Sequence, residues 1–219
     1  MYHPIKMPSN KHYGSNHWVA FSYKIQRNVQ LFSNLEYDNW IFVETDPNIV
    51  NFCEQPKKIS YPLNGKTKHS IFDMWIQYSD GQEVFLEVKY SKELHPLHKK
   101  FERNINQIGV QREWCAANGF GHRVITEKDL QSNGLLLSNK KLILSLIKNT
   151  NEDSLFQQII DHIIKVKTAS FKELTTAFYP IPKDEVIKRI GLGMYRGNIK
   201  GPISKTAINH DFEVIYCET

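Results

Sequence analysis

Three ionisable residues lie close together in a stretch that otherwise looks like two β-strands. Residues 71–90 read IFDMWIQYSDGQEVFLEVKY, in which two apolar runs flank the turn signal Ser-Asp-Gly at 79–81. Asp73 lies on the first run, and Glu87 and Lys89 lie on the second. Two carboxylates and an amine on an apolar hairpin are candidates for catalysis, although a solvated face with a cross-strand ion pair is the commoner explanation of such a set.

The register of the expected hairpin follows from matching its apolar faces. Alternation along a strand places Phe72 on the same face as Met74, and Asp73 on the opposite face. Matching the apolar faces of the two runs requires a three-residue loop that ends in a left-handed Gly81. Asp73 then pairs with Glu87, so the two carboxylates converge on one patch.

Carboxylates held this close repel each other, which raises the pKa of each unless a cation lies between them. Mg²⁺ is the natural candidate, because it prefers carboxylate oxygens, retains several waters and often binds phosphate oxygens as well. Lys89 lies two residues beyond Glu87 and shares its face, where an amine can orient a water or stabilise charge on a phosphate. The predicted chemistry is metal-assisted phosphodiester hydrolysis.

The composition is that of an ordinary globular protein with a mild basic excess. The 219 residues are 41% hydrophobic and carry a formal net charge of +5, which suits a polyanionic partner without reaching the charge of a basic nucleic-acid-binding tail. Cys53, Cys115 and Cys217 form no C-x-x-C pair, so neither a disulfide framework nor a zinc site is predicted. Because no apolar segment is long enough to span a bilayer, we expect a cytoplasmic protein without membrane association.

The region before the hairpin is expected to hold an arm and a helix. Residues 1–30 are polar, with strand character only around 17–23, which predicts an arm that docks late or a disordered tail. Ser33 and Glu36 match a capping box that would begin a helix ending near residue 44. Glu36 could therefore serve as the capping acid or point from the helix toward the hairpin, and spacing alone favours the cap.

The remaining elements of this half follow from turn signals and periodicity. Predicted in order are a turn-initiated segment at 46–56, a strand at 57–63, a long strand that holds Asp73, the strand of Glu87, a helix at about 97–117 and a strand at 122–126. Together with the first helix, these form the order helix, three strands, helix, strand.

The chain after residue 127 has a different character, which predicts a domain boundary there. Four helices are expected, at 139–148, 152–165, 170–179 and 182–195, followed by strand signals at 201–217. These patterns fit a winged-helix-like module or a plain helical bundle equally well. Six basic residues near the last helix and hairpin could bind DNA phosphates or a partner's acids, or form a solvated face: Lys183, Lys188, Arg189, Arg196, Lys200 and Lys205.

The element order and several short motifs resemble the core of the PD-(D/E)xK nuclease superfamily. More narrowly, the chain resembles TnsA, the endonuclease subunit of heteromeric cut-and-paste transposases. The motifs are SNLE at 33–36, DPNIV at 46–50, FCEQP at 52–56, FD at 72–73, EVK at 87–89 and VITE at 124–127.

This resemblance implies an α/β fold with a restriction-endonuclease-like αβββαβ domain at residues 1–127, followed by a helical, winged-helix-like domain at 128–219 that binds partners and DNA. It further implies Mg²⁺-dependent cleavage of double-stranded DNA at the 5′ ends of a transposon, with Mn²⁺ able to substitute. The implied partners are a TnsB-like transposase that processes the 3′ ends and a TnsC-like ATPase, on the nucleoid of a bacterium.

The resemblance also assigns roles to single residues. The family's helix acid falls on Glu36, its metal-binding strand acid on Asp73 and its lysine on Lys89, while Glu87 stands at the second strand acid of the superfamily motif. The three acids are the implied metal ligands, which makes Glu36 a catalytic residue as well as a cap. Phe72 departs from the family, which often has proline before the strand acid.

Two other functions compete with this assignment. A stand-alone PD-(D/E)xK nuclease of restriction or repair type would cut specific or structured DNA without partners. A DNA-binding adaptor with a degenerate nuclease core is a third possibility, and the intact set of Asp73, Glu87 and Lys89 argues against it.

Overall fold

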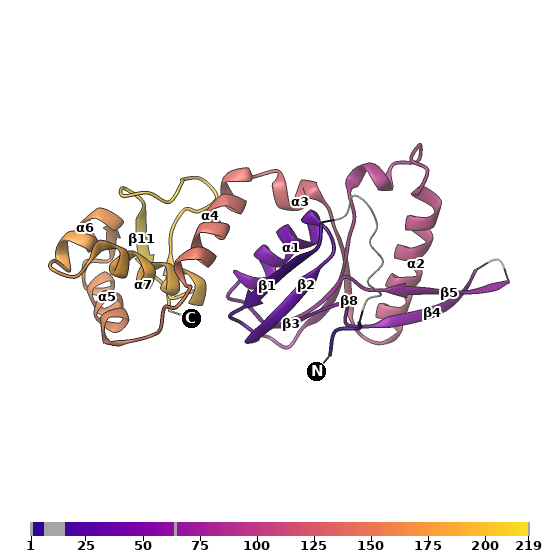
Figure 1. Cartoon of the computed structure of the whole chain (residues 1–219), viewed down its shortest axis with the longest axis horizontal. Helices are drawn as coiled ribbons and strands as arrows, with labels where there is room; N and C mark the ends of the chain where they lie inside the picture. The colour runs from indigo at the N-terminus through magenta and orange to yellow at the C-terminus, as the bar shows by residue number, and fades with distance from the viewer. Residues whose placement is uncertain (1, 7–15, 64, 219) are drawn as a thin grey trace. The chain divides into compact units, whose positions relative to one another are not determined.

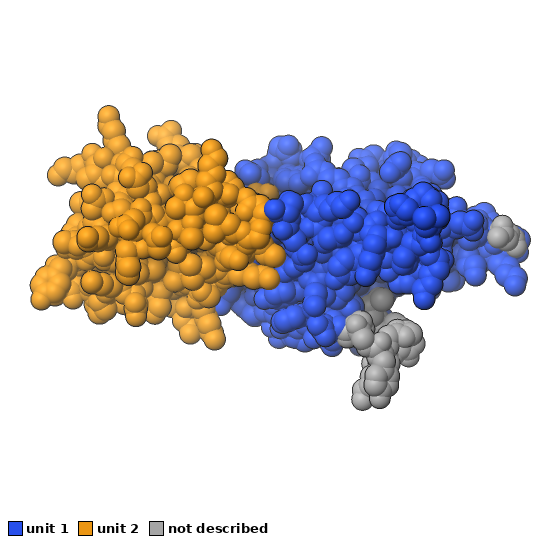
Figure 2. Space-filling model, turned by 90° about the horizontal axis from the view of Figure 1, so that it is seen from above, with its two compact units in different colours: residues 1–44, 48–132 blue, residues 45–47, 133–219 orange. Residues whose placement is uncertain are grey.

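The computed structural model describes residues 2–6, 16–63 and 65–218, and its contacts divide the chain into two units. One unit comprises residues 1–44 and 48–132, and the other comprises residues 45–47 and 133–219 (Figure 2). The division after residue 132 lies beyond the expected boundary at 127, because a short helix that follows residue 126 packs within the first unit. Among the described residues, no helix combines the length and the apolar character that a bilayer crossing requires.

A mixed four-stranded sheet organises the first unit (Figure 1). Its strand order is β3-β6-β7-β8, with β7 and β8 parallel and the other neighbours antiparallel. Two separate antiparallel ribbons, β1-β2 and β4-β5, accompany it. The elements in chain order are β1 (Trp18–Ser22), β2 (Arg27–Leu31), α1 (Asn34–Glu44), β3 (Ile49–Glu54), β4 (Lys58–Leu63), β5 (Lys66–Ile71), β6 (Met74–Tyr78), β7 (Glu83–Val88), the 3₁₀ helix η1 (Ser91–Leu94), α2 (Phe101–Ala117), β8 (Gly121–Ile125) and α3 (Glu127–Gln131).

The core of this unit lies on both faces of the sheet. Phe85 of β7 packs against Trp114 of α2 on one face, with ring centroids 5.5 Å apart. Val88 of the same strand packs with Leu35 of α1 and Leu130 of α3 on the other face. Because residues of opposite parity on a strand point to opposite sides, β7 is covered by helices on both sides. The expected restriction-endonuclease-like α/β fold is confirmed.

The predicted hairpin register is also confirmed. Met74 pairs with Leu86 and Ile76 pairs with Val84, and the ladder ends at Met74, one residue before the position at which Asp73 would face Glu87. Gly81 has a φ of +87°, in the left-handed region that a glycine adopts readily.

The long strand expected around Asp73 is instead two strands. β5 pairs with β4 and ends at Ile71, whereas β6 begins at Met74 and pairs with β3 and β7. The chain changes partners across Phe72 and Asp73, so the expected grouping of Phe72 with Met74 on one face is wrong. The Phe72 ring packs on Phe85, with centroids 4.6 Å apart, on the face covered by α2.

Three further differences have local causes. Residues 49–54 form β3, because pairing with β6 and the burial of residues 52–54 outweigh the helix-start signal of Pro47. The helix expected from residue 97 begins at Phe101, after the 3₁₀ turn η1. The N-terminal arm forms the β1-β2 ribbon, and Tyr2 packs edge-on against Trp75 at 5.0 Å; the rest of the arm, residues 7–15, lies outside the described residues.

The second unit combines helices with a small antiparallel sheet of order β10-β11-β9. This sheet distinguishes the unit from the plain helical bundle and fits the winged-helix-like alternative. All four expected helices are present, the first beginning at Gly134 rather than 139. The elements are α4 (Gly134–Leu146), α5 (Ser154–Val166), β9 (Thr168–Ser170), α6 (Phe171–Ala177), α7 (Lys183–Arg196), β10 (Ile199–Lys200) and β11 (Glu213–Tyr216).

Candidate active site

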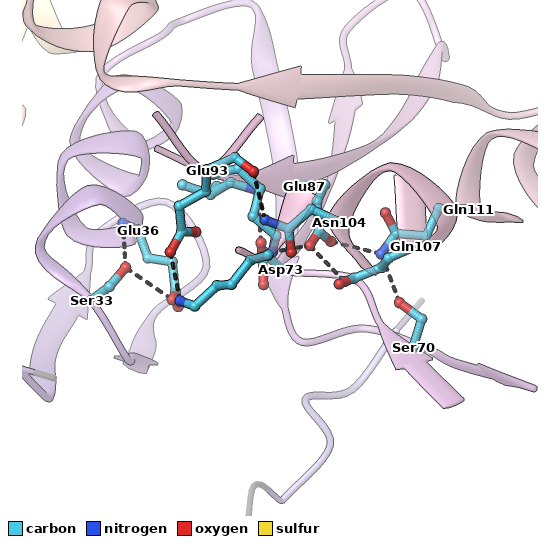
Figure 3. A network of polar contacts seen from close by, with 12 residues as sticks. Ser33, Glu36, Ser70, Asp73, Glu87, Glu93, Asn104, Gln107 and Gln111 are labelled. Atoms are coloured by element: carbon cyan, nitrogen blue, oxygen red, sulfur yellow. Dashed lines mark hydrogen bonds and ion pairs between the residues drawn. The ribbon is translucent and has the colours of Figure 1, made fainter. Parts of the chain in front are cut away.

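The hairpin brings Asp73, Glu87 and Lys89 together at one end of the sheet (Figure 3). Asp73 lies just before β6, and its Oδ2 accepts a hydrogen bond from the backbone N–H of Val88 at 2.7 Å. The Lys89 ammonium donates to Oε1 of Glu87. The Glu87 side chain is fully buried, whereas 17% of the Lys89 side chain is exposed, so the lysine is the member of this ion pair that reaches solvent.

Glu36 combines the two roles that its position in the sequence left open. As part of the cap of α1, its backbone N–H donates to Ser33 Oγ at 3.1 Å, and its Oε1 accepts from the Ser33 hydroxyl at 3.0 Å. Its Oε2 accepts from the backbone N–H of Phe32 at 3.0 Å. The same carboxylate interacts electrostatically with Asp73 and Lys89, so the cap acid also belongs to the hairpin cluster.

Two amides of α2 hold the Glu87 carboxylate, and the sequence did not single them out. Gln107 Nε2 donates to Oε1 at 2.7 Å, and Gln111 Nε2 donates to Oε2 at 2.6 Å. Gln111 Nε2 also donates to Ser70 Oγ, at 3.0 Å (Figure 3). A signal was available, because Gln111 follows the buried Ile108 at helical spacing, and a buried amide there must find polar partners.

The pKa values of the acids in this cluster are raised mainly because the acids are buried. Burial, followed by the charge of Asp73, raises the pKa of Glu36 to about 7 and that of Glu87 to about 8. Burial also raises the pKa of Asp73. Burial alone would lower the pKa of Lys89, but the charges of Asp73 and Glu87 outweigh it and raise that pKa. A divalent cation would favour the ionised carboxylates and so oppose the burial and the repulsion that raise these pKa values.

A pocket of about 370 Å³ opens beside this cluster and gives a substrate access to it. Glu36 and Lys89 both line it. Glu93 and Lys100, which the sequence had not indicated, line it too and form an ion pair, with 2.6 Å between Nζ and Oε1. The pocket therefore presents acids and amines together, a surface suited to a cation and a phosphate.

The donor chemistry of Glu36 and Asp73 fits Mg²⁺, because both supply hard carboxylate oxygens, Glu36 lines the pocket and Asp73 interacts with it electrostatically. Both oxygens of Glu87 already accept bonds from nitrogen donors. Within the described ranges, no three His, Cys, Asp or Glu side chains lie in an arrangement that could hold a metal ion by themselves. The expectation that Glu36, Asp73 and Glu87 all bind the metal stays a prediction, and waters and substrate oxygens would complete its coordination.

The basic residues singled out in the second unit fall into two groups. Three of them already form ion pairs inside that unit, namely Lys188 with Glu185, Arg189 with Asp153 and Glu185, and Arg196 with Glu152. Lys183, Lys200 and Lys205 are exposed. The expectation that all six bind DNA or a partner stays a prediction, and the first three have a structural role in addition.

Acids from α1 and from the β6 and β7 ends, with a lysine beside them on an α/β fold, are consistent with a nuclease domain of the PD-(D/E)xK class. Residues 46–127 match the family model described as TnsA-like endonuclease N terminal. The match includes Asp73, Glu87 and Lys89, and Glu36 precedes it.

A curated relative supports the same class. The "Head completion nuclease" of Enterobacteria phage T4 is 29% identical to this chain over 121 residues, which cover 47% of this chain and 81% of the phage protein.

Proposed function

We propose that this protein is a metal-dependent DNA endonuclease that hydrolyses phosphodiester bonds at the Glu36, Asp73, Glu87 and Lys89 site. The observation that carries the proposal is that Asp73 and Lys89 interact electrostatically with both Glu36 and Glu87, while Glu36 and Lys89 line a pocket. Buried like charges are costly to a folded protein, so their retention at a cleft favours a functional role.

Each residue has a distinct task in this proposal. Glu36 and Asp73 supply oxygens to the Mg²⁺, or to Mn²⁺ in its place, and the bound metal lowers the pKa of a water and polarises the phosphate. Lys89 extends into the pocket and stabilises negative charge that develops on the phosphate. Glu87 is held by Gln107 and Gln111, and it fixes the position of Lys89 through their ion pair.

The TnsA-like domain supports a more specific proposal, that the enzyme cuts the 5′ ends of a transposon. A TnsB-like transposase would process the 3′ ends, and a TnsC-like ATPase would regulate the complex. The second unit, residues 133–219, carries no comparable set of acids and lysine among its described residues, so we assign to it the recruitment of these partners or of DNA.

The phage relative favours a second candidate function, a nuclease that works without a transposase. The alignment covers 81% of the phage protein, so most of a protein named a nuclease consists of the region that matches this chain. In this case the purified protein should cut double-stranded DNA by itself.

A strand-resolved cleavage assay separates these functions. Duplex DNA with the ends of the neighbouring transposon is incubated with Mg²⁺ and the intact chain, with and without the neighbouring transposase and ATPase. Cleavage only at the 5′ ends and only with the partners supports the transposon function, and partner-free cutting supports the second candidate. Wild-type cutting by an Asp73→Asn variant, which retains an acceptor for Val88 N–H but not the charge, would overturn both.

A further inference from the structure

The β4-β5 ribbon is the most strongly basic segment of the first unit. Residues 56–72 contain four lysines and no Asp or Glu, against a formal net charge of +5 for the whole chain. Figure 1 shows β4 and β5 as two long arrows that reach out beyond α2. The ribbon is thus a projecting element with one sign of charge.

The pairing of the ribbon places two of these lysines on one face. Lys68 lies opposite Tyr61, and Lys66 lies opposite Leu63. Both lysines share the parity of Ser70, so all three side chains project from the same side of β5. Both lysines are exposed, whereas Ser70 is buried at the base of the ribbon.

This lysine face leads directly to the candidate active site. Ser70 Oγ accepts a hydrogen bond from Gln111, and the same Gln111 nitrogen donates to Glu87 (Figure 3). Asp73 follows Ser70 by three positions in the chain. Lys68 and Lys66 therefore lie on the same face of β5 as Ser70, two and four residues farther toward the tip of the ribbon. Gln111 links that face to Glu87.

The charges of this face are not neutralised within the protein. Neither Lys66 nor Lys68 forms an ion pair with any described acid, in contrast to Lys188 and Arg189 of the second unit. Unpaired lysines on a projecting ribbon repel one another and have unused hydrogen-bond donors. A polyanion would satisfy both.

The dimensions of the ribbon favour duplex DNA as that polyanion. The major groove admits a two-stranded β-ribbon. Two residues of strand span about 6.6 Å, close to the rise of two nucleotides along the axis of duplex DNA, about 3.4 Å each. Lysines two residues apart on one face therefore match phosphates along a single strand.

We propose that the β4-β5 ribbon is the DNA-holding element of the nuclease, with Lys66 and Lys68 on backbone phosphates of the duplex at a distance from the bond to be cut. This inference rests on the proposed function and adds the element that positions its substrate. Phosphate contacts of this kind supply affinity without reading sequence, so end recognition is left to other parts of the complex.

The test compares two charge-matched variants of the intact chain. Lys66→Gln/Lys68→Gln removes the ribbon charges, and Lys165→Gln/Lys172→Gln removes two exposed lysines of the second unit. The Kd for a fluorescent duplex is measured by anisotropy in EDTA, which suppresses cleavage, at several salt concentrations. Each lost phosphate contact lowers the slope of log Kd against log salt by about 0.9, so the ribbon variant should lose about 1.8 and bind roughly tenfold or more weakly.

Cleavage kinetics in Mg²⁺ provide a second readout. We expect the ribbon variant to show a raised KM with kcat nearly unchanged, because the lost contacts bind substrate and transition state alike. The ribbon inference is overturned if the unaltered chain binds and cuts DNA while the two variants have the same salt slope and KM. If the unaltered chain neither binds nor cuts DNA under any of these conditions, the proposed function itself is wrong.

Discussion

Asp73 accepts a hydrogen bond from the backbone of Val88, with 2.7 Å between Oδ2 and N. This bond ties the junction of β5 and β6 to the end of β7, between the positions of Glu87 and Lys89. The acid that follows the ribbon and the lysine that follows the sheet are thereby fixed to each other. Several properties of the site follow from this arrangement and can be measured.

Protein stability should depend on pH in a direction opposite to that of ordinary surface acids. Glu36 and Glu87 have pKa values of about 7 and about 8 when folded, above the usual 4.5. Between pH 4.5 and 8 the folded protein therefore holds protons that the unfolded chain has released, so stability falls as pH rises through this window. The Tm of the metal-free protein in EDTA should be lower at pH 8 than at pH 6.

Mg²⁺ should reverse this trend, since it replaces the protons and binds better when the acids are ionised. We expect it to raise the Tm more at pH 8 than at pH 6, and a Glu36→Gln/Glu87→Gln variant should lose most of both effects. A Tm in EDTA that rises between pH 6 and pH 8 would show that the acids are not crowded as described.

Gln111→Leu should impair cleavage through Glu87 and Lys89 without touching the metal. The change removes one donor from the Glu87 carboxylate and one from Ser70. By analogy with residues that support metal ligands, we expect a roughly 10- to 100-fold lower kcat and a loss of about 1–3 kcal/mol in unfolding free energy.

Glu113→Gln on the exposed side of the same helix is the matched control for Gln111→Leu and should change neither quantity. The rate is measured by single-turnover cleavage and the stability by urea unfolding. Equal kcat in Gln111→Leu and in the control would remove the positioning role from the α2 amides.

The cap of α1 and the acid of the site can be separated by two substitutions. Ser33→Ala removes the hydroxyl that bonds Glu36 and should cost about 0.5–2 kcal/mol of stability, as other cap removals do, with a small effect on cleavage. Glu36→Gln retains one acceptor oxygen for Phe32 N–H, and its amide nitrogen can donate to Ser33 Oγ, but it lacks the charge. It should therefore keep most of the stability and lose at least about 100-fold in cleavage rate.

Ser33→Ala should mainly lower the stability, and Glu36→Gln should mainly lower the cleavage rate. Should Ser33→Ala lose as much activity as Glu36→Gln at a temperature where both are folded, the acid would act only through the geometry of the helix.

A truncated chain that ends at residue 132 should retain the nuclease site, whereas one that ends at residue 127 should not fold as well. Leu130 of α3 is buried against Leu35 and Val88, directly beside the site. Thermal unfolding should therefore give the shorter chain the lower Tm. We also expect the chain that ends at residue 132 to bind Mg²⁺ but to lose cleavage in the assembled complex, because it lacks the second unit.

Much of the site was predictable because its residues are local in sequence. The three-residue turn and the apolar alternation set the register that brings Asp73 to Glu87, and the capping box placed Glu36 at the start of α1. The partners on α2 were not predicted, since Gln107 and Gln111 meet Glu87 only through tertiary packing. The strand β3 was missed because its pairing with β6 outweighs the turn and helix signals before it.

In the second unit, the helices were predictable from the sequence, whereas the strand pairing and the ion pairs were not. Its helices were expected from periodicity, but β9 is three residues long and is stabilised by its pairing with β11, a partner far along the chain. The basic residues of α7 looked available in the sequence, whereas Arg189 forms an ion pair at 2.6 Å with Asp153, the N-cap residue of α5. Charge in a sequence predicts a cation, and only the fold decides whether its partner is internal.

Phe72 changes how the site obtains its rigidity. The family that the sequence resembles is expected to have proline at this place, where the ring would restrict the backbone directly. Here the fully buried Phe72 ring is held between Phe85 and Trp114, with centroids at 4.6 Å and 5.5 Å. The stiffness of the peptide before Asp73 thus comes from side-chain packing, so substitutions in the aromatic core, at a distance from any charged atom, are a route by which this enzyme can lose its active-site geometry.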